Sequence, residues 1–359
     1  MKAAICYEFG KPLVIEDIDI DPPKQGEVKI RLAATAICHS DVHAIRGDWG
    51  GSPPFVPGHE AAGVVEEVGE NVTMTKPGDP VVVSLLRSCG RCFYCTTGSP
   101  HMCGEDFALN TESRLRNKQG DSLKHGLWTA AFAEYTIVDQ SQVVPVATEI
   151  PLDRAALLAC GVITGFGAVI NTAKVESGSS VVVIGAGGVG LNAIQGAVLS
   201  GAYPIIAVDL LDNKLAAART FGATHTINIS SQDKLEEKIK ALTSNLGADY
   251  VFVTVGNTTA MVQGFTMLRN QGLEVIVGIA EAGATIPLPA GLFLGERKVM
   301  GSAMGSTRLS VDVPRLVDLY LHQRLKLDEL ITARYPLEQI NEAIESMEKG
   351  EALRNVIMF

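Results

Sequence analysis

The sequence has no surplus of basic residues and no basic run. Its 40 acidic and 30 basic residues give a formal charge of −10. A surface that binds nucleic acid needs clustered lysine and arginine, so we expect no nucleic-acid partner. The beginning of the chain also lacks the apolar core of a signal peptide. These two absences predict a cytoplasmic protein.

The sequence also has little that favours a membrane span. Residues 177–208 carry no charge and are numerous enough to cross a bilayer. However, seven glycines and Pro204 divide this stretch into short apolar blocks. Such blocks are typical of a buried strand, a helix and a second buried strand. We therefore expect no membrane association.

The chain is long enough for two domains, with 359 residues of which 47% are hydrophobic. Up to about residue 150 it has short β-type runs separated by Gly and Pro. From about Ala155, apolar strands alternate with helical stretches, which predicts a doubly wound parallel sheet. The expected strands are 180–184, 204–208, 250–253, 274–277 and a last apolar run at 356–359. The expected helices are 191–199, 213–221, 232–243 and 337–349.

A G-x-G-x-x-G turn follows the first of these strands and opens a helix. Its residues are Gly185, Gly187, Gly188 and Gly190, with Val189 between the last two. Glycines let the backbone approach a pyrophosphate, and the helix N-terminus offers it free N–H groups. Asp209 ends the next strand, where a carboxylate accepts from both ribose hydroxyls and repels a 2′-phosphate. The pattern predicts NAD binding, with Lys214 in reach of the same ribose.

Four of the seven cysteines form a C-x2-C-x2-C-x7-C cluster, Cys89, Cys92, Cys95 and Cys103. Four thiolates suit tetrahedral zinc and leave no open position, so this metal would be structural. An iron–sulfur cluster and a disulfide pair are the alternatives. Three further segments contain Cys38, His59 and Cys160. They could supply two thiolates and an imidazole to a second zinc.

These motifs together resemble the zinc-dependent medium-chain alcohol dehydrogenases over essentially the whole chain. The segments that carry the resemblance are 37–41 (ICHSD), 58–65 (GHEAAGVV), the four-cysteine cluster, 159–161 (ACG) with 164–165 (TG), the GAGGVG turn with Asp209, and 353–357 (LRNVI). The resemblance implies a GroES-like, partly open β-barrel catalytic domain and an inserted Rossmann domain, with the active site in the cleft. The implied boundaries are 1–161, with a structural-zinc lobe at 88–104, then 162–305 and 306–359.

The resemblance also implies the roles of the residues around a catalytic zinc. Cys38, His59 and Cys160 would bind it, with Glu60 behind the metal and Asp41 orienting His59. The zinc would act as a Lewis acid on the alcohol oxygen while a hydride passes to nicotinamide C4.

A proton would then leave through Ser40, the nicotinamide ribose and His43, which is the terminal base; the alternative is that His43 is an ordinary surface histidine. Residues implied to contact the cofactor are His39 and Arg354 at the pyrophosphate, and Thr164, Lys214 and Val277 elsewhere on it. The family's dimers or tetramers lead us to expect a homodimer or homotetramer.

The sequence indicates the class of substrate less directly than it indicates the metal and the cofactor. The implied pocket residues are Trp49, Leu85, Phe107, Trp128 and Met304, whose apolar bulk favours primary aliphatic or aromatic alcohols and disfavours sugars and charged acids. No clear cationic clamp for a carboxylate is evident, although Arg87, Arg114 and Arg116 are near in sequence. The loop 104–126 is polar, and we expect it to shape the mouth of the pocket. His39 replaces the family's usual arginine, which predicts weaker NAD binding and faster NADH release.

Rival functions remain within and outside the family. A polyol dehydrogenase would tend to have Glu at the third ligand position, where this chain has Cys160. A cinnamyl-type NADP reductase would lack Asp209, and a zinc-free quinone reductase would lack the metal-type cysteines. Glutathione-linked formaldehyde oxidation is disfavoured because the segment 46–51 is short. A dinucleotide-binding scaffold without turnover is the alternative of another class.

Overall fold

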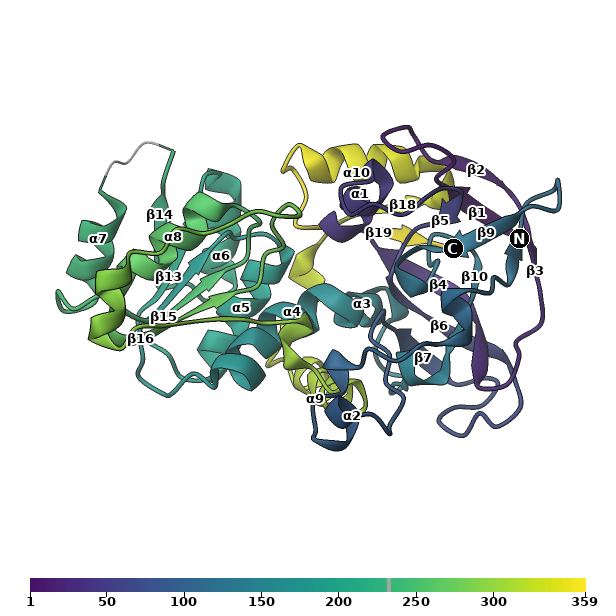
Figure 1. Cartoon of the computed structure of the whole chain (residues 1–359), viewed down its shortest axis with the longest axis horizontal. Helices are drawn as coiled ribbons and strands as arrows, with labels where there is room; N and C mark the ends of the chain where they lie inside the picture. Colours follow the sequence, from purple (N-terminus) through teal and green to yellow (C-terminus); the bar gives the residue numbers. More distant parts are fainter. Residues whose placement is uncertain (231–233) are drawn as a thin grey trace. The chain divides into compact units, whose positions relative to one another are not determined.

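The computed structural model describes residues 1–230 and 234–359. The chain forms two compact units. The split unit comprises Met1–Cys160 and Arg308–Phe359, and the inserted unit comprises Gly161–Thr307 (Figure 1). The split unit therefore contains both ends of the chain.

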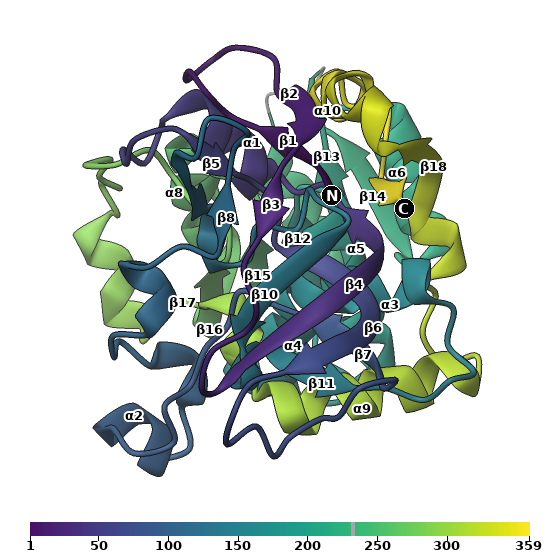
Figure 2. The same ribbon diagram turned by 90° about the vertical axis from the view of Figure 1, so that its right-hand side faces the viewer.

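The main sheet of the split unit has seven strands, of which β4 is the longest (Figure 2). Its strands are β4 (Glu27–Ala36), β6 (Glu60–Val68), β7 (Pro80–Val83), β10 (Tyr135–Asp139), β11 (Val143–Pro145), β18 (Ile331–Pro336) and β19 (Arg354–Met358). They follow the order β11-β7-β6-β4-β19-β18, and β10 also pairs with β4. Strand β19 is antiparallel to β4. The C-terminal segment thus returns to the sheet begun before residue 40.

Two smaller sheets and five α-helices complete the split unit. The small sheets pair β1 (Lys2–Ile5) with β2 (Val14–Asp17), and join β3 (Asp19–Ile20), β8 (Leu115–Arg116), β9 (Ser122–His125) and β5 (Phe55–Val56). The helices are α1 (His39–Arg46), α2 (Phe93–Thr96), α3 (Leu152–Leu157), α9 (Leu309–Leu321) and α10 (Ile340–Glu348). Helix α1 ends at Gly47, whose φ of 82° suits a left-handed C-cap.

The inserted unit is built on a six-stranded parallel sheet (Figure 1). Its strands are β12 (Val181–Ile184), β13 (Ile205–Asp209), β14 (His225–Asn228), β15 (Ala248–Val253), β16 (Leu268–Ile276) and β17 (Lys298–Gly301). The order β14-β13-β12-β15-β16-β17 reverses direction between β12 and β15. In doubly wound folds, ligands bind beyond the carboxyl ends of the strands at such a reversal.

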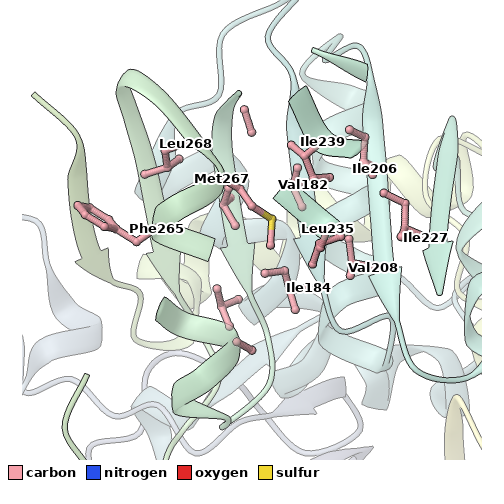
Figure 3. Close-up of a cluster of buried hydrophobic side chains, with 14 of the residues drawn as sticks. Val182, Ile184, Ile206, Val208, Ile227, Leu235, Ile239, Phe265, Met267 and Leu268 are labelled. Carbon is pink, nitrogen blue, oxygen red and sulfur yellow. The ribbon is translucent and has the colours of Figure 1, made fainter. Parts of the chain in front are cut away.

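The helices of the inserted unit cover this sheet and account for its core. They are α4 (Ile163–Gly167), α5 (Gly188–Leu199), α6 (Asp212–Thr220), α7 (Leu235–Leu242) and α8 (Thr258–Met267). Val182, Ile206 and Val208 of the strands pack with Ile239 of α7 and Phe265 of α8 (Figure 3). Strands covered by helices are uniformly apolar, which explains the uncharged runs in this part of the sequence.

The sequence-based fold class is confirmed, including the strand–helix–strand order over 177–208. Strand β16 begins at Leu268, earlier than the expected 274, because its first part carries polar residues that give no strand signal. Helix α7 begins at Leu235. The expected start at Gln232 lies outside the described residues. Strands β14 and β17 and helices α8 and α9 were not expected from the sequence.

One helical run, Leu152–Ala173, is long and apolar enough to cross a membrane by length and composition. Within the structure, 83% of its apolar window is buried. Burial of that degree is what the core helix of a folded domain shows.

Candidate active site

Four buried side chains of the split unit meet at one point. Cys38, His59, Glu60 and Cys160 each bring a ligand-type atom, and these atoms lie within 4.8 Å of one another. Cys38 immediately precedes α1, and His59 and Glu60 stand at the start of β6. The cluster therefore unites three segments that are far apart in the sequence, which the sequence could place together only by resemblance.

The carboxylate of Asp41 fixes the geometry of this cluster. Its Oδ1 lies 2.8 Å from Nδ1 of His59 and accepts from the Gly58 backbone N–H at 3.2 Å, while its Oδ2 accepts from the Cys38 backbone N–H at 3.0 Å. Asp41 and His59 are both 0% exposed. A neutral imidazole that donates its Nδ1 proton to this carboxylate has its Nε2 available as a metal ligand beside the cysteine sulfurs.

The buried cluster fits a metal ion. Nε2 of His59 and Oε1 of Glu60 are buried without a hydrogen-bond partner, a costly state in a protein interior. Two thiols, an imidazole and a carboxylate are the donors that zinc prefers. Hydrogen bonding from Cys160 holds the pKa of Cys38 well below its usual range, and sharing that proton raises the pKa of Cys160. The lowered pKa of Cys38 favours the thiolate form that binds a metal.

Glu60 and Arg354 form a buried ion pair behind the cluster. Nη2 of Arg354 donates to Oε2 of Glu60, and the two side chains are 7% and 0% exposed. Burial raises the pKa of Glu60 to about 7, although the Arg354 charge opposes this shift. The structure places Arg354 against Glu60, and its contact with a pyrophosphate stays a prediction.

The other four cysteines form a second group, around α2 of the split unit. The sulfurs of Cys89 and Cys95 are 3.9 Å apart, as are those of Cys92 and Cys103. Ligands 2.3 Å from a tetrahedral zinc stand about 3.8 Å apart, so the spacing suits that ion. Backbone N–H donation, first from Arg91, lowers the pKa of Cys89 to about 7. All seven cysteines are unbridged, which excludes the disulfide alternative for this structure.

The two residues proposed to move a proton lie on α1. Ser40 is half-buried in its first turn, and His43 is one turn further on. Nδ1 of His43 lies 2.7 Å from Oδ2 of Asp48, and its ring stacks on Trp49 at a centroid distance of 5.3 Å. The sequence did not indicate Asp48 as a partner of His43. Asp48 lies beyond Gly47, the C-cap of the helix, so helical spacing does not relate it to His43.

The glycine turn of the inserted unit has the shape that the motif predicts. Gly185 has a φ of 93°, and a Cβ there would lie 2.6 Å from Val255. A Cβ at Gly190 would lie 1.8 Å from the carbonyl oxygen of Gly185. By contrast, nothing stands within 4 Å of a Cβ at Gly187, the N-cap of α5. The open side of the turn is therefore free to receive a phosphate.

Asp209 lies beside this turn at the end of β13. Its Oδ2 accepts from the Ala186 backbone N–H at 2.7 Å, and its Oδ1 accepts from Leu211 at 3.0 Å. Lys214 is 7% exposed, and burial lowers its pKa. Together they give one acid and one amine next to the turn, as a ribose site requires.

The remaining predicted contacts are distributed over both units. Thr164 donates to the Met304 sulfur at 3.6 Å, and Val277 is 9% exposed just after β16. His39 is exposed at the start of α1, in the split unit. Of the expected pocket residues, Met304 belongs to the inserted unit and the other four to the split unit.

The loop 104–126 is anchored in the split unit through a buried arginine. Arg114, 2% exposed, donates to both carboxylate oxygens of Glu27 at 2.9 and 2.6 Å. Nη1 of the same side chain reaches Glu112 at 3.0 Å. Arg116 is exposed and lies 3.6 Å from Asp21. Of the three arginines noted in the sequence, Arg114 and Arg116 are thus engaged by carboxylates.

Comparison with known proteins gives a consistent family. The family models named alcohol dehydrogenase GroES-like domain and zinc-binding dehydrogenase match residues 24–148 and 188–321. The chain is 40% identical to alcohol dehydrogenase class-3 of Drosophila melanogaster, covering all of this chain and 97% of that protein.

Solved structures agree over the full length. An alcohol dehydrogenase zinc-binding domain protein from Burkholderia ambifaria is 35% identical, with a TM-score of 0.95, over 100% of this chain and 98% of that one. Benzyl alcohol dehydrogenase from Acinetobacter calcoaceticus is 32% identical, with a TM-score of 0.93, over 100% and 99%. The chain belongs to the zinc-dependent medium-chain alcohol dehydrogenases, and is an NAD-dependent oxidoreductase of that family.

Proposed function

We propose that the protein interconverts primary alcohols, aliphatic or aromatic, and their aldehydes with NAD(H). The observation that carries the proposal is the buried Cys38–His59–Cys160 cluster, whose imidazole Nε2 has no partner. A benzyl alcohol dehydrogenase among the similar structures supports an aromatic substrate. Cys160 at the third ligand position favours this chemistry over that of polyol dehydrogenases, which tend to have Glu there.

The catalytic metal would be held by Cys38, His59 and Cys160. Zinc bound there supplies a Lewis acid that lowers the pKa of an alcohol. Asp41 keeps His59 in the tautomer whose Nε2 is free to coordinate, since it accepts the Nδ1 proton. Glu60 stands beside these ligands and its charge is balanced by Arg354.

Proton release would use α1. Ser40 would accept the substrate proton and pass it, by way of the nicotinamide ribose, to His43 near the surface. The Asp48 carboxylate, 2.7 Å from Nδ1 of His43, orients the ring. A side chain that is 37% exposed can then exchange the proton with water.

Cofactor binding would rest on the glycine turn and Asp209. The Gly187 N-cap and the first turn of α5 would donate to the pyrophosphate. Asp209 would accept from the ribose hydroxyls and exclude a 2′-phosphate, so NAD is preferred to NADP. His39, Thr164, Lys214, Val277 and Arg354 are the further proposed contacts.

Three properties complete the proposal. Each chain would bind two zinc ions, the second one at Cys89, Cys92, Cys95 and Cys103. The protein would be cytoplasmic. Two chains would associate through the exposed edge of β17, beside which Leu294 is 91% exposed and Met300 is 41% exposed.

A panel of substrates tests this function. NADH formation would be followed with ethanol, hexanol, benzyl alcohol, a secondary alcohol and a polyol, each with NAD and with NADP. We expect primary alcohols to be oxidised with the highest kcat/KM, and with NAD preferred. A preference for the polyol or the secondary alcohol would contradict the substrate assignment, and absence of turnover with every alcohol and aldehyde would favour a scaffold.

A further inference from the structure

Arg87 lies between two aromatic rings of the split unit. Its guanidinium carbon is 4.5 Å from the centroid of Phe107 and 4.7 Å from that of Trp128. These three residues are called the Arg87 cluster below. A guanidinium stacked on aromatic faces has its plane fixed, and its N–H groups point outward from the edge of that plane.

Most of the hydrogen-bonding capacity of Arg87 is not used by carboxylates. Nη1 donates to Oδ1 of Asn110 at 2.5 Å. Among residues 1–230 and 234–359, no carboxylate lies within ion-pair distance of Arg87, in contrast to Arg114 and Arg116. The side chain is half-buried, and burial lowers its pKa. Asp139, Cys103 and Asp106 act on its charge from beyond ion-pair distance and oppose this lowering of the pKa. The guanidinium therefore remains a partly desolvated cation with N–H groups that no carboxylate of the described residues contacts directly.

The Arg87 cluster is tied to the catalytic cluster by hydrogen bonds within the split unit. Ser84 Oγ donates to the carbonyl oxygen of Ala159, the residue before Cys160, at 2.6 Å. Arg87 follows Ser84 by three residues, a reach of roughly 10 Å at most. The fully buried Gln142 side chain donates to the carbonyl oxygens of Ser84 and Trp128 at 2.8 and 3.2 Å. The segment that carries Arg87 and the backbone of Trp128 are thus linked through hydrogen bonds to the residue before Cys160.

We propose that Arg87 binds an anionic group at the far end of the substrate, so that the enzyme favours primary alcohols that carry a carboxylate. The inference rests on the proposed function and names a substrate class for that site. The rings of Phe107 and Trp128 would contact the apolar body of such an alcohol, and the guanidinium edge would bind its carboxylate in a bidentate manner. This revises the expectation that charged acids are excluded.

An aromatic spacer fits this proposal. A para-substituted benzyl alcohol carries its hydroxyl and its carboxylate at opposite ends of one rigid ring. A lysine at this position could not replace the arginine fully, because an ammonium is a point charge that neither stacks nor forms two parallel hydrogen bonds.

The test compares two nearly isosteric substrates, 4-(hydroxymethyl)benzoate and 4-(hydroxymethyl)benzamide, with benzyl alcohol as the reference. In the wild type we expect a higher kcat/KM for the benzoate than for the benzamide. Arg87→Gln should lower kcat/KM for the benzoate by about 10- to 100-fold, the loss of a charge-assisted hydrogen bond, and change that for benzyl alcohol by less than about threefold. Arg87→Lys should recover part of the loss.

Arg116→Gln serves as the matched control, since Arg116 is exposed and already faces Asp21. Equilibrium binding of the benzoate to the enzyme–NADH complex should weaken in Arg87→Gln and stay unchanged in the control. Equal losses on all three substrates would show a structural role and overturn the inference. A wild type that oxidises benzyl alcohol but does not prefer the benzoate would overturn the inference alone, whereas no oxidation of any of the three would overturn the proposed function with it.

Discussion

Asp41 accepts hydrogen bonds from three groups at the catalytic cluster, namely the Cys38 and Gly58 backbones and the His59 ring. One carboxylate therefore sets the position of two proposed zinc ligands and the tautomer of one of them. Replacing a buried residue of this kind shifts several atoms of the site together.

Replacing Asp41 tests this role. Asp41→Asn removes the charge that stabilises the Nδ1 proton of His59, so we expect about 10- to 100-fold weaker zinc binding at the catalytic cluster. The measurement is a chelator titration that follows the release of the two zinc ions separately. The control is Asp19→Asn, an exposed acid of β3. Zinc retention equal to that of the control would contradict the role assigned to Asp41.

Glu274 is a buried acid without a partner, in the core of the inserted unit. It is 0% exposed, and both its carboxylate oxygens are without hydrogen bonds. Burial raises its pKa to about 8. Above the unfolded pKa the unfolded state releases this proton while the folded state keeps it, so stability falls as pH rises towards the folded pKa.

The consequence is a pH-dependent stability. We expect Glu274 to lower the free energy of unfolding by about 3 kcal/mol between about pH 5 and pH 8. The Glu274→Gln variant should lack this decrease, so the difference between the two proteins in denaturant unfolding should grow with pH. A constant difference from about pH 5 to pH 8 would show that Glu274 does not titrate in this way.

By the resemblance, His39 would occupy the position at which the family usually has an arginine for the pyrophosphate. It is exposed at the start of α1. If His39 contacts the pyrophosphate as proposed, a positive charge at this position strengthens the contact. We expect His39→Arg to bind NAD more tightly and to release NADH more slowly, because arginine is always charged. Stopped-flow NADH release measures this, and an unchanged rate would refute the contact.

At the scale of elements, two glycines of the turn before α5 are needed for different reasons, one for the fold of the turn and one for cofactor binding. Gly185 needs its positive φ and has no room for a Cβ, whereas Gly187 has room on the side where the cofactor would lie. Close approach of backbone to a pyrophosphate is the reason for a glycine at the second position of the motif.

Two alanine variants distinguish these requirements. Gly185→Ala should lower the thermal stability of the protein without cofactor, because its Cβ would meet Val255 and Thr254. Gly187→Ala should leave that stability nearly unchanged but raise the Kd for NAD at least about tenfold, by blocking the pyrophosphate. Calorimetry measures the thermal stability of each variant, and titration with NAD measures its Kd. Equal NAD affinity in Gly187→Ala would contradict the proposed cofactor position.

The elements also show where sequence patterns suffice. The runs VVVI at 181–184 and IIAV at 205–208 are uniformly apolar because helices cover both faces of the sheet, and they predict β12 and β13 well. Strand β16 and the edge strand β17 were misjudged or missed, since polar or exposed residues fill them. Periodicity reports burial, and elements that are buried little are poorly predicted.

The residues of the candidate site also divide into those that a sequence pattern reveals and those that it does not. The four clustered cysteines and the glycine turn are local motifs, so their spacing alone identified them. Cys38, His59 and Cys160 are brought together only by tertiary folding, and the resemblance was needed to group them. Arg87, Phe107 and Trp128 were each noted in the sequence, but their stacking was not predicted, because contact between residues 87, 107 and 128 depends on the loop conformation.

For the whole molecule, the chain consists of a split unit with both cysteine groups and an inserted unit with the dinucleotide turn. The inserted unit ends its sheet at β17, whose outer edge pairs with no strand of the described residues. An open edge next to exposed apolar side chains is a surface that a second copy can cover.

This arrangement predicts an oligomer. Met300→Glu in β17 would place a charge at the proposed contact, and should shift sedimentation from a dimer or tetramer towards smaller species. Leu246→Glu, at an exposed apolar position elsewhere in the same unit, is the control and should leave the assembly unchanged. A wild type that sediments as a monomer would contradict the expected assembly.

The most direct test of the central claim is NADH formation from benzyl alcohol in protein of known zinc content. We predict two zinc ions per chain, NAD-dependent turnover, loss of that turnover when chelation removes one ion, and its return when zinc is added. The His59→Ala variant should retain the zinc of the four-cysteine group and have no turnover. Full activity in protein without zinc, or in His59→Ala, would contradict a zinc-dependent alcohol dehydrogenase with its catalytic metal at Cys38, His59 and Cys160.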